Sequence, residues 1–281
     1  MKEGILLLDK EEGVTSRRVD NLVARRFLSK KVGHLGTLDP FATGLLVVAV
    51  GKGTKFLPYL DSSYKTYLAK LILGEKKDTG DLTGRTIERR GIPSFGEKEI
   101  DKSLSSFLGF SKQLPPMTSA IKIDGVPLYK LAHKGESKER KERPIEVKEL
   151  LCLGRGENWI EFQATVSSGT YIRVLGEDIA VKLGTVGYLE SLRRTKIGPL
   201  DVKEAKKLGE LTEEDFLSPS PFVNLERVEI DGKEALEARN GKKICLTRAK
   251  GDEVALVHEG EVLAVYARES GPMFVSKRGL F

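Results

Sequence analysis

The order of hydrophobic and polar positions along the chain predicts strands and helices in alternation over the first 200 residues. Strands are expected where apolar runs or β-branched and aromatic residues cluster: 5–8, 45–50, 64–73, 145–153 and 159–166. Helices are expected where apolar side chains recur on one stripe: 16–27, 97–108 and 171–183. A further strand and helix are expected before residue 218. The pattern therefore predicts a mixed α and β fold.

Local signals refine these elements. Ser16 is the expected N-cap of the first helix, and Gly184 is the expected stop of the helix over 171–183. The dipeptide Asp124-Gly125 is a favoured hairpin turn and is expected to close a strand over 118–123. Residues 134–144 form a charge run without apolar periodicity, so we expect a mobile loop there.

The pattern changes at the segment Ser218-Pro219-Ser220-Pro221, which interrupts regular structure. Short β-like runs separated by glycine-bearing turns follow it: 243–246, 253–258, 262–267 and 273–275. This spacing predicts a small all-β module at the C-terminal end. We therefore expect two domains, over residues 1–228 and 229–281.

Charge is unevenly distributed along this 281-residue chain, whose formal net charge is +6. Residues 10–55 hold nine basic and four acidic side chains, and a second basic excess lies in residues 130–148. A face that binds a polyanion concentrates positive charge, so nucleic acid is the leading candidate partner. On charge counts alone, solvated helix faces are an equally good interpretation.

Several classes of protein are disfavoured by composition and motif. The longest apolar run, Leu45 to Val50, is too short to cross a membrane, and the first residues lack a signal-peptide pattern, which predicts a cytoplasmic protein. Two cysteines far apart exclude a disulfide framework, and the three histidines are scattered. No metal-ligand spacing, P-loop or dinucleotide fingerprint is present, so we expect chemistry without metal or cofactor.

Asp39 is the candidate for that chemistry. It is the only acidic residue between Asp20 and Asp61, and Pro40 restrains it to an extended conformation. A carboxylate isolated within a basic surface weakens polyanion binding, which suggests that it acts on the bound partner. Taken alone, an Asp-Pro dipeptide is more typical of a simple turn.

The loop around this aspartate, from Gly33 to Gly44, reads GHLGTLDPFATG and resembles the GHxGxLDPxATG motif of the TruB family of RNA pseudouridine synthases. Four further elements resemble the family's in the same order: Leu6–Lys10 with Gly13, Lys65-Thr66-Tyr67, Ser168–Arg173 and Leu192-Arg193-Arg194. The C-terminal module is similar, more weakly, to the family's PUA domain. Glu11 departs from the pattern, because the family usually has proline there.

The resemblance implies an α+β fold, with a mixed, mainly antiparallel sheet, flanking helices and a small all-β PUA domain. It implies isomerisation of uridine to pseudouridine at position 55, in the TΨC stem-loop of tRNA. No metal or cofactor is needed, because a carboxylate can stabilise or trap the oxocarbenium character at the sugar.

The resemblance also assigns roles to residues. Asp39 is the catalytic residue, Arg173 pairs with it and keeps it ionised, and Tyr67 stacks on the base and manages the C5 proton. Leu192 lines the other side of the uracil pocket, and His34 helps to hold the target nucleotide out of its stack. The other expected substrate or RNA contacts are Lys10, which could instead brace the loop, and Tyr171, Arg193, Arg194, Arg17, Arg18, Arg25, Arg26, Lys30 and Lys31.

Residues 124–148 correspond to a thumb-like insertion that closes on RNA and is expected to be poorly ordered without it. The C-terminal module is expected to hold another part of the tRNA. We expect a monomer that needs no protein partner. Two alternatives are an RNA-binding protein with a vestigial pocket, and a family member that works with a guide RNA and partner proteins.

Overall fold

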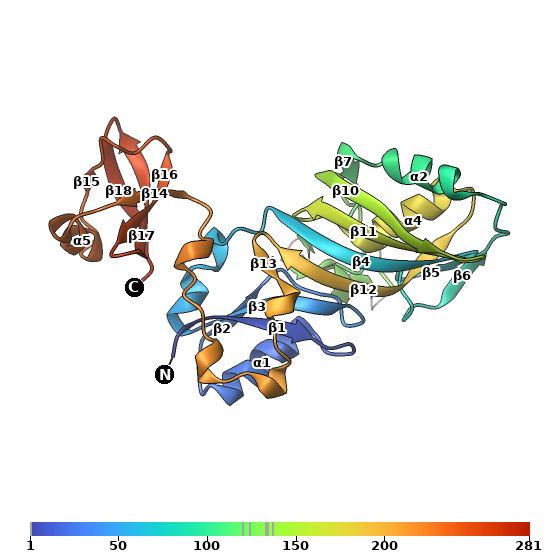
Figure 1. Ribbon diagram of the computed structural model, residues 1–281, viewed down its shortest axis with the longest axis horizontal. Coiled ribbons are helices and arrows are strands. Elements are labelled where there is room, and N and C mark those ends of the chain that lie inside the picture. Colours follow the sequence, from blue (N-terminus) through green and yellow to red (C-terminus); the bar gives the residue numbers. More distant parts are fainter. Residues whose placement is uncertain (1, 120, 124, 133–134, 137) are drawn as a thin grey trace.

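The computed structural model describes residues 2–119, 121–123, 125–132, 135–136 and 138–281, and two sheets dominate it (Figure 1). The larger sheet has nine strands in the order β1-β3-β12-β4-β11-β10-β7, with β2 beside β3 and β13 beside β12. Its strands are β1 (Gly4–Lys10), β2 (Val32–Leu35), β3 (Thr43–Val50), β4 (Tyr64–Leu73), β7 (Gly109–Gln113), β10 (Arg143–Arg155), β11 (Trp159–Ser167), β12 (Gly187–Ile197) and β13 (Leu200–Asp201).

One strand pair in this sheet is parallel and short. β12 pairs with β3 only at Arg193↔Thr43 and Arg194↔Gly44, whereas every other pairing in the sheet is antiparallel. We call this two-residue junction the seam. It joins a half made of β1, β2 and β3 to a half made of β12, β13, β4, β11, β10 and β7.

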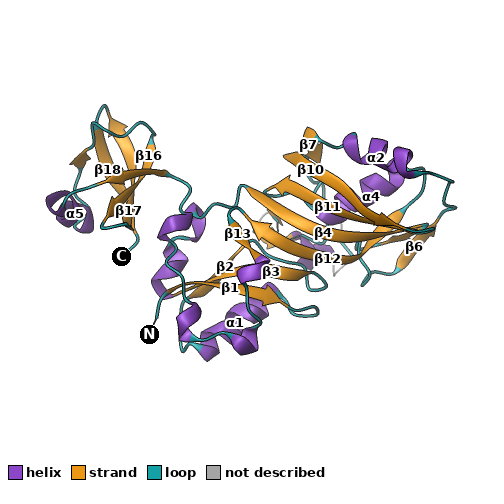
Figure 2. Cartoon of the chain, viewed as in Figure 1, coloured by secondary structure: helices purple, strands orange, loops and turns teal. Residues whose placement is uncertain are grey.

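Helices cover the two halves separately (Figure 2). α1 (Ser16–Arg26) buries Val19 and Val23 in a cluster with apolar residues of β1 and β3. α4 (Ile172–Lys182) and α2 (Glu97–Ser105) pack on the other half, where Ile172 and Ile179 join the cluster that contains Phe162. Each helix thus buries one apolar stripe against the sheet, as its periodicity predicts.

Two small hairpins extend from the larger sheet. β5 (Glu75–Lys77) pairs with β6 (Thr86–Arg89), and β8 (Lys122–Ile123) pairs with β9 (Val126–Pro127). A short helix, α3 (Leu128–Ala132), follows β9 and buries Leu128 and Leu131. The expected hairpin at residues 124–125 is therefore present, although Asp124 itself lies outside the described residues.

The second sheet lies at the C-terminal end and has the order β14-β16-β17-β18-β15. Its elements are β14 (Glu226–Glu229), α5 (Gly232–Arg239), β15 (Ile244–Cys245), β16 (Glu253–His258), β17 (Glu261–Ser270) and β18 (Met273–Gly279). It shares one apolar cluster with the larger sheet, in which Val257 and Val262 join Ile5 and Leu45. The two sheets are therefore joined by packing as well as by the chain.

Most expected strands and helices are confirmed, and five details are corrected. The N-cap of α1 is Thr15, whose side chain accepts from the N–H of Arg18, while Ser16 is the first helical residue. The glycine-rich loop begins as strand β2, and the strand expected over 118–123 covers only residues 122–123. Short 3-10 turns replace the helix expected after β12, and the C-terminal module contains helix α5.

The expected domain boundary, between residues 228 and 229, falls inside β14, so the second sheet begins at Glu226. The division into two domains itself stays a prediction. Residues 134 and 137 of the mobile loop expected over 134–144 lie outside the described residues, and its mobility also stays a prediction. Among the helices that the structure describes, each is too short or too polar to cross a membrane.

Candidate active site

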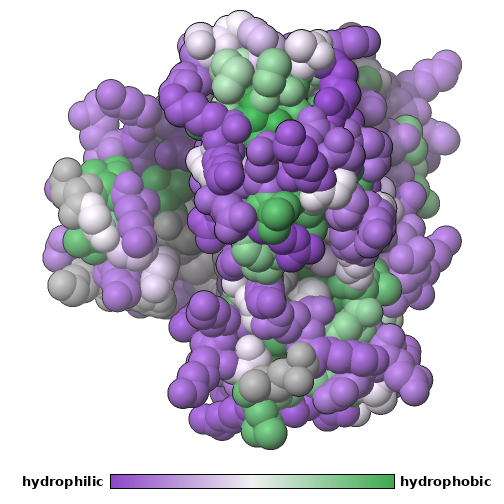
Figure 3. All heavy atoms as spheres, turned by 90° about the vertical axis from the view of Figure 1, so that its left-hand side faces the viewer, coloured by the Kyte–Doolittle hydropathy of each residue, from purple (hydrophilic) through white to green (hydrophobic). Residues whose placement is uncertain are grey.

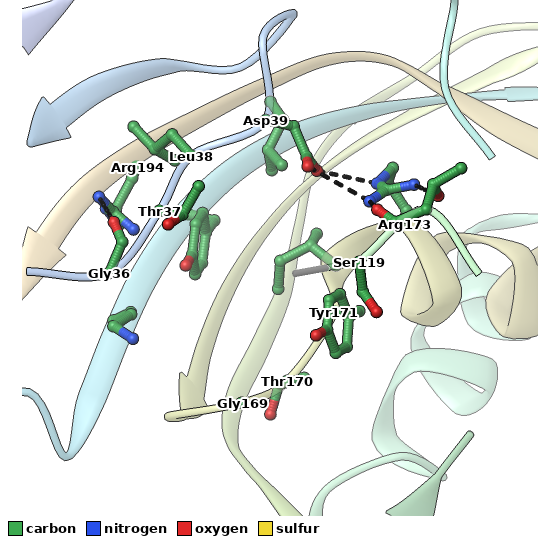
Figure 4. Close-up of a pocket in the computed structure, with 15 residues that line it drawn as sticks. Gly36, Thr37, Leu38, Asp39, Ser119, Gly169, Thr170, Tyr171, Arg173 and Arg194 are labelled. Carbon is green, nitrogen blue, oxygen red and sulfur yellow. Dashed lines mark hydrogen bonds and ion pairs between the residues drawn. The ribbon is translucent and has the colours of Figure 1, made fainter. Parts of the chain in front are cut away.

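A pocket of about 290 Å³ opens beside the seam. Its wall comes from segments far apart in sequence, which the sheet and α4 bring together (Figure 4). It is lined by Gly36, Thr37, Leu38, Asp39, Lys65, Tyr67, Thr118, Ser119, Gly169, Thr170, Tyr171, Ile172, Arg173, Leu192 and Arg194. Elements of both sheet halves therefore meet in this cavity.

Asp39 and Arg173 form a two-point ion pair in the pocket (Figure 4). Arg173 donates from Nε to Oδ2 at 2.9 Å and from Nη2 to Oδ1 at 3.3 Å. The Arg173 side chain is 4% exposed, whereas that of Asp39 is 34% exposed. The guanidinium thus lies inside the protein and orients a carboxylate that remains accessible from the pocket.

The remaining donors of Arg173 bind two other segments of the chain. Nη1 donates to the carbonyl of Thr79 at 2.7 Å and to Oγ1 of Thr118 at 2.5 Å, and Nη2 donates to the carbonyl of Thr118 at 3.0 Å. Asp81 lies behind the guanidinium, with Oδ2 at 3.9 Å from Nε. All five N–H groups of Arg173 are therefore used by the protein.

The buried side chain of Lys10 supports the loop that carries Asp39. Lys10 is 1% exposed, and its Nζ donates to the carbonyls of Glu11, Val14 and Pro40 at 2.8, 2.7 and 3.2 Å. Burial lowers the pKa of Lys10 to about 8. The expected RNA contact is thus buried in this structure, where it braces the loop.

The environment of Asp39 shifts its pKa upward. The protein packed around the carboxylate disfavours its charged form and is the dominant influence, while Arg173 acts in the opposite direction. Arg173 was expected to keep Asp39 ionised. The pairing is present and favours the carboxylate, but burial outweighs it and the net shift is upward.

Tyr67 and Leu192 line the pocket from neighbouring strands. Tyr67 of β4 lies opposite Arg194 of β12, and Leu192 lies opposite Ala69, so all four residues share one face of the sheet. The Tyr67 and Leu192 side chains are almost fully buried. An aromatic ring and an aliphatic side chain are therefore placed where a flat, uncharged ring could lie between them.

Lys65 also lies in the pocket, although it was not expected there. It precedes Tyr67 by two positions on β4 and therefore faces the same way, and its Nζ donates to Oγ of Ser168 at 3.1 Å. Burial lowers the pKa of Lys65 to about 8, and the neighbouring Arg194 acts in the same direction. The alternation of side chains along β4 was the signal that could have identified it.

His34 lies at the edge of this region, between two elements. Its Nδ1 is 2.9 Å from Oδ2 of the buried Asp20 on α1, and its Nε2 is 3.0 Å from Oγ1 of Thr37. These contacts fix the orientation of the imidazole next to the Asp39 loop. The side chain is 16% exposed, so part of it faces solvent.

The remaining motif residues have structural partners. Arg193 makes a two-point pair with Asp9, at 2.9 and 2.7 Å. Arg194 is 1% exposed and donates to the carbonyls of Leu45 and Gly36. Tyr171 is the N-cap residue of α4, and its backbone is held by Gln113. Both arginines therefore stabilise the seam in this structure.

The basic side chains of the first helix region are all exposed but differ in their partners: Arg17, Arg18, Arg25, Arg26, Lys30 and Lys31. The guanidinium of Arg26 donates to the carbonyls of Leu211 and Gly209, so it fastens α1 to the segment after β13. The other five residues form a basic surface that runs along α1 and the turn after it.

Thr79, Asp81, Thr118 and Ser119 are site residues that the sequence did not identify. Thr79 and Asp81 belong to a turn whose hydroxyl groups bind Oδ1 of Asp81, and turn chemistry was the only signal in that stretch. Thr118 and Ser119 follow Pro115-Pro116 at the start of the strand expected over 118–123, and none of the motifs that carry the family resemblance includes them. Only the fold brings them to Arg173.

No group of three or more His, Cys, Asp or Glu side chains that could hold a metal ion occurs among the described residues. Chemistry without metal or cofactor stays a prediction.

Comparison with known proteins places this chain in a family. Residues 25–172 match the model described as TruB family pseudouridylate synthase (N terminal domain). The protein called tRNA pseudouridine synthase B from Geobacter sulfurreducens is 39% identical over 281 aligned residues, which cover 94% of this chain and 92% of that protein. The protein of the same name from Hydrogenovibrio crunogenus is 40% identical, with 87% and 82% covered.

Two solved structures share the fold. A chain of a Cbf5-Nop10-Gar1 complex superposes with a TM-score of 0.77 at 23% identity, covering 99% of this chain and 85% of that one. A chain of an archaeal box H/ACA sRNP Nop10-Cbf5 complex gives 0.73 at 21% identity, with 99% and 86% covered. These likenesses confirm the expected fold, a mixed sheet with flanking helices followed by a small C-terminal β module.

Proposed function

The chain belongs to the TruB family of pseudouridylate synthases, and we propose on that basis that it isomerises uridine to pseudouridine in the TΨC stem-loop of tRNA. The reaction breaks the bond from N1 to C1′, forms a bond from C5 to C1′, and moves a proton from C5 while N1 gains one. Atoms and electrons balance without an oxidant or a second substrate. A pocket with one oriented carboxylate suits this chemistry.

The observation that carries the proposal is the pair formed by Asp39 and Arg173. Arg173 holds both carboxylate oxygens of Asp39, so one face of the carboxylate points into the pocket in a fixed orientation. A carboxylate in that position stabilises or traps positive charge that develops at C1′ of the ribose. Asp39 is therefore the proposed catalytic residue, and Arg173 orients it.

The uracil ring is proposed to lie between Tyr67 and Leu192. Both side chains face the pocket from adjacent strands, and the Tyr67 hydroxyl is the proposed group that handles the C5 proton. A base can enter this pocket only when it leaves its stack in the folded RNA. His34, held by Asp20 and Thr37, is proposed to keep the nucleotide in that position.

The RNA backbone is proposed to follow the basic surface on α1, where Arg17, Arg18 and Lys31 are exposed. The insertion over 124–148 is proposed to close on the RNA, and the module over 229–281 to bind another part of the tRNA. We propose that the protein acts as a monomer, without a protein partner or guide RNA, and that it works in the cytoplasm with its tRNA substrate.

The test is release of tritium from a T-stem-loop labelled at C5 of the target uridine. The wild-type protein is expected to release it, and Asp39→Asn is expected to reduce the rate by about 10³-fold or more. Asp252→Asn, at a side chain that is 95% exposed, is the matched control and should match wild type.

The result also separates the alternative functions. Tight binding of tRNA without tritium release by the wild-type protein would instead favour an RNA-binding protein with a vestigial pocket. Release only in the presence of a guide RNA and partner proteins would favour the guided class.

A further inference from the structure

We propose that the hydroxyl group of Ser119 hydrogen-bonds the target nucleotide inside the pocket, which makes Ser119 a substrate-recognition residue. The ligand is a neutral polar group of the nucleotide, either a uracil carbonyl or the ribose 2′-hydroxyl. The inference rests on the proposed function, because it takes the nucleotide as the occupant of the pocket.

Ser119 combines burial with an unused hydroxyl. The residue is 3% exposed and lines the pocket, and its Oγ has no hydrogen-bond partner within the part of the chain that the structure describes. A buried hydroxyl without a partner is unfavourable, because it has lost its hydrogen bonds to water. Occupation of the pocket by a polar ligand would supply the missing bond.

A second buried serine also has a hydroxyl group without a hydrogen-bond partner, but it lies elsewhere in the fold. Ser103 of α2 is 5% exposed, and its Oγ also lacks a partner among the described residues. Ser103 lines a separate cavity with Pro93 and Lys182 and is not among the residues that line the catalytic pocket. The missing bond therefore points to the target nucleotide only at Ser119, and Ser103 serves as its matched control.

The position of Ser119 is fixed from two sides. Thr118 on one side holds Arg173 through its hydroxyl and its carbonyl. On the other side, the N–H of Tyr129 donates to the carbonyl of Ser119 at 3.0 Å, and the N–H of Leu128 donates to the carbonyl of Ile121 at 2.8 Å. Figure 4 shows Ser119 between Arg173 and Tyr171. Its backbone thus links the ion pair to the insertion that contains α3.

The two arginines that line the pocket are already committed to the protein. All five N–H groups of Arg173 bind Asp39, Thr79 or Thr118, so none is left for the nucleotide. Arg194 donates to two carbonyls of the protein. A serine hydroxyl can both donate and accept, which suits a uracil carbonyl or a 2′-hydroxyl equally well.

The experiment compares Ser119→Ala with Ser103→Ala and wild type. Single-turnover rates are measured with the enzyme in excess over RNA but at a low, subsaturating concentration. The T-stem-loops carry uridine, 2′-deoxyuridine, 2-thiouridine or 4-thiouridine at the target. We expect Ser119→Ala to lower the rate on uridine by about 3- to 10-fold, the effect of one neutral hydrogen bond. Ser103→Ala should match wild type, and both variants should keep the wild-type Tm.

The modified substrates show whether Ser119 contacts the nucleotide and where. If it does, one modification slows the wild-type protein and has a smaller effect on Ser119→Ala: the 2′-deoxy substitution for a ribose contact, or a thio substitution for a carbonyl contact. An unchanged rate on uridine would overturn the proposal. A lower rate of Ser119→Ala on uridine would also overturn the proposal if every modification slowed the variant and wild type by the same factor. Ser119 would then affect the rate only by supporting the structure of the pocket, without contacting the nucleotide.

The comparison of substrates remains valid for a variant with a lowered Tm. Each ratio compares the rates of one protein on a modified substrate and on uridine, so the stability of that protein affects both rates alike. If wild type releases no tritium at all, the proposed function fails rather than the role of Ser119.

Discussion

Arg173 determines, at the scale of single residues, how the carboxylate of Asp39 is oriented in the pocket. Its five N–H groups bind Asp39 and the two segments around Thr79 and Thr118, which leaves the guanidinium no freedom to turn. Burial of the pair raises the pKa of Asp39, although Arg173 opposes the shift. Orientation and protonation of one carboxylate are therefore set by the same neighbours.

The pH dependence of the reaction should reflect this pKa. The proposed mechanism requires the ionised carboxylate of Asp39, so the rate is expected to fall as the pH drops through the pKa of Asp39, with a midpoint above the ordinary value for aspartate. Single-turnover rates against pH measure the midpoint, and RNA binding at each pH controls for loss of the complex. A rate that stays constant down to the ordinary pKa of aspartate would contradict the upward shift.

Lys10 provides a second residue-scale prediction, because it braces the loop without reaching the surface. Lys10→Met should remove three hydrogen bonds beneath Asp39 and lower kcat by about 10- to 100-fold through misplacement of the carboxylate. The Kd for the stem-loop should stay within about twofold, with an unchanged salt dependence. A loss confined to RNA affinity would instead make Lys10 a phosphate contact.

At the scale of elements, the seam between β3 and β12 requires a residue without a side chain. Gly44 has φ of +98°, and a Cβ there would lie 2.2 Å from the carbonyl oxygen of Arg194. Because both atoms belong to paired strands, neither can move away without breaking the pairing. The absence of a side chain at Gly44 therefore allows β3 and β12 to pair at the seam.

Gly44→Ala is therefore expected to destabilise the protein by about 2 kcal/mol or more, since it adds both a clash and an unfavourable φ. Thermal unfolding measures the effect. Gly91→Ala is the control, because a Cβ at Gly91 meets nothing within 4 Å and its φ is not in the left-handed region. Equal Tm values for the two variants would show that the seam tolerates a wider separation.

Helix α1 offers a prediction about two arginines of one element. Both Arg18 and Arg26 are exposed, but the guanidinium of Arg26 donates to the carbonyls of Leu211 and Gly209. Arg18→Ala should weaken RNA binding and lower the slope of log K against log salt by about one. Arg26→Ala should lower the free energy of unfolding by about 1–2 kcal/mol and leave that slope unchanged. The opposite assignment would place the RNA path nearer Arg26.

The sequence predicted elements well where one pattern was strong. β4 spans Tyr64–Leu73 as expected, and the motif residues Asp39, Tyr67, Arg173 and Leu192 meet in one pocket. Helix α5 was missed because its apolar stripe is weak and its Leu236 is exposed. Its capping box, Asp231 with Glu234, was the available signal.

The partners of Arg173 other than Asp39 were not predictable for a different reason. Thr79 and Thr118 both bind it through backbone carbonyls, which every residue possesses, so residue identity carries no information about those contacts. Only Oγ1 of Thr118 adds a side-chain acceptor. The burial of Lys10 and Arg194 likewise depends on how strands pair across the seam. Such facts belong to tertiary structure and leave no local pattern.

At the scale of the whole molecule, the two sheets pack against each other in one apolar cluster. Val257 and Val262 of the C-terminal sheet pack in one cluster with Ile5 and Leu45. Ser220, in the 3-10 turn that connects the sheets, holds this turn to the C-terminal sheet through Oγ, which accepts from the N–H of Val262 and donates to Glu261. Figure 3 shows that the molecular face at the C-terminal end is mostly hydrophilic, with small, separate hydrophobic patches.

Removal of residues 226–281 should therefore destabilise the remaining chain, because it exposes the shared cluster to water. We expect the truncated protein to unfold several degrees below the full chain and to aggregate more readily, as measured by calorimetry and light scattering. Ser220→Ala in the full chain is the milder companion variant, since it removes only the polar link. An undiminished Tm after truncation would show that the cluster contributes little.

The seam also has a consequence for the order of events during folding. Asp39 belongs to the half with β3, whereas Tyr67 and Arg173 belong to the other half, and 134 positions separate Asp39 from Arg173. Contacts between such distant segments require closure of a long loop and form late. A chain in which only one half has folded therefore has either the aspartate or its arginine in place, never both. Catalytic competence should appear only when the sheet closes across the seam. A nascent or misfolded chain is therefore expected not to modify RNA.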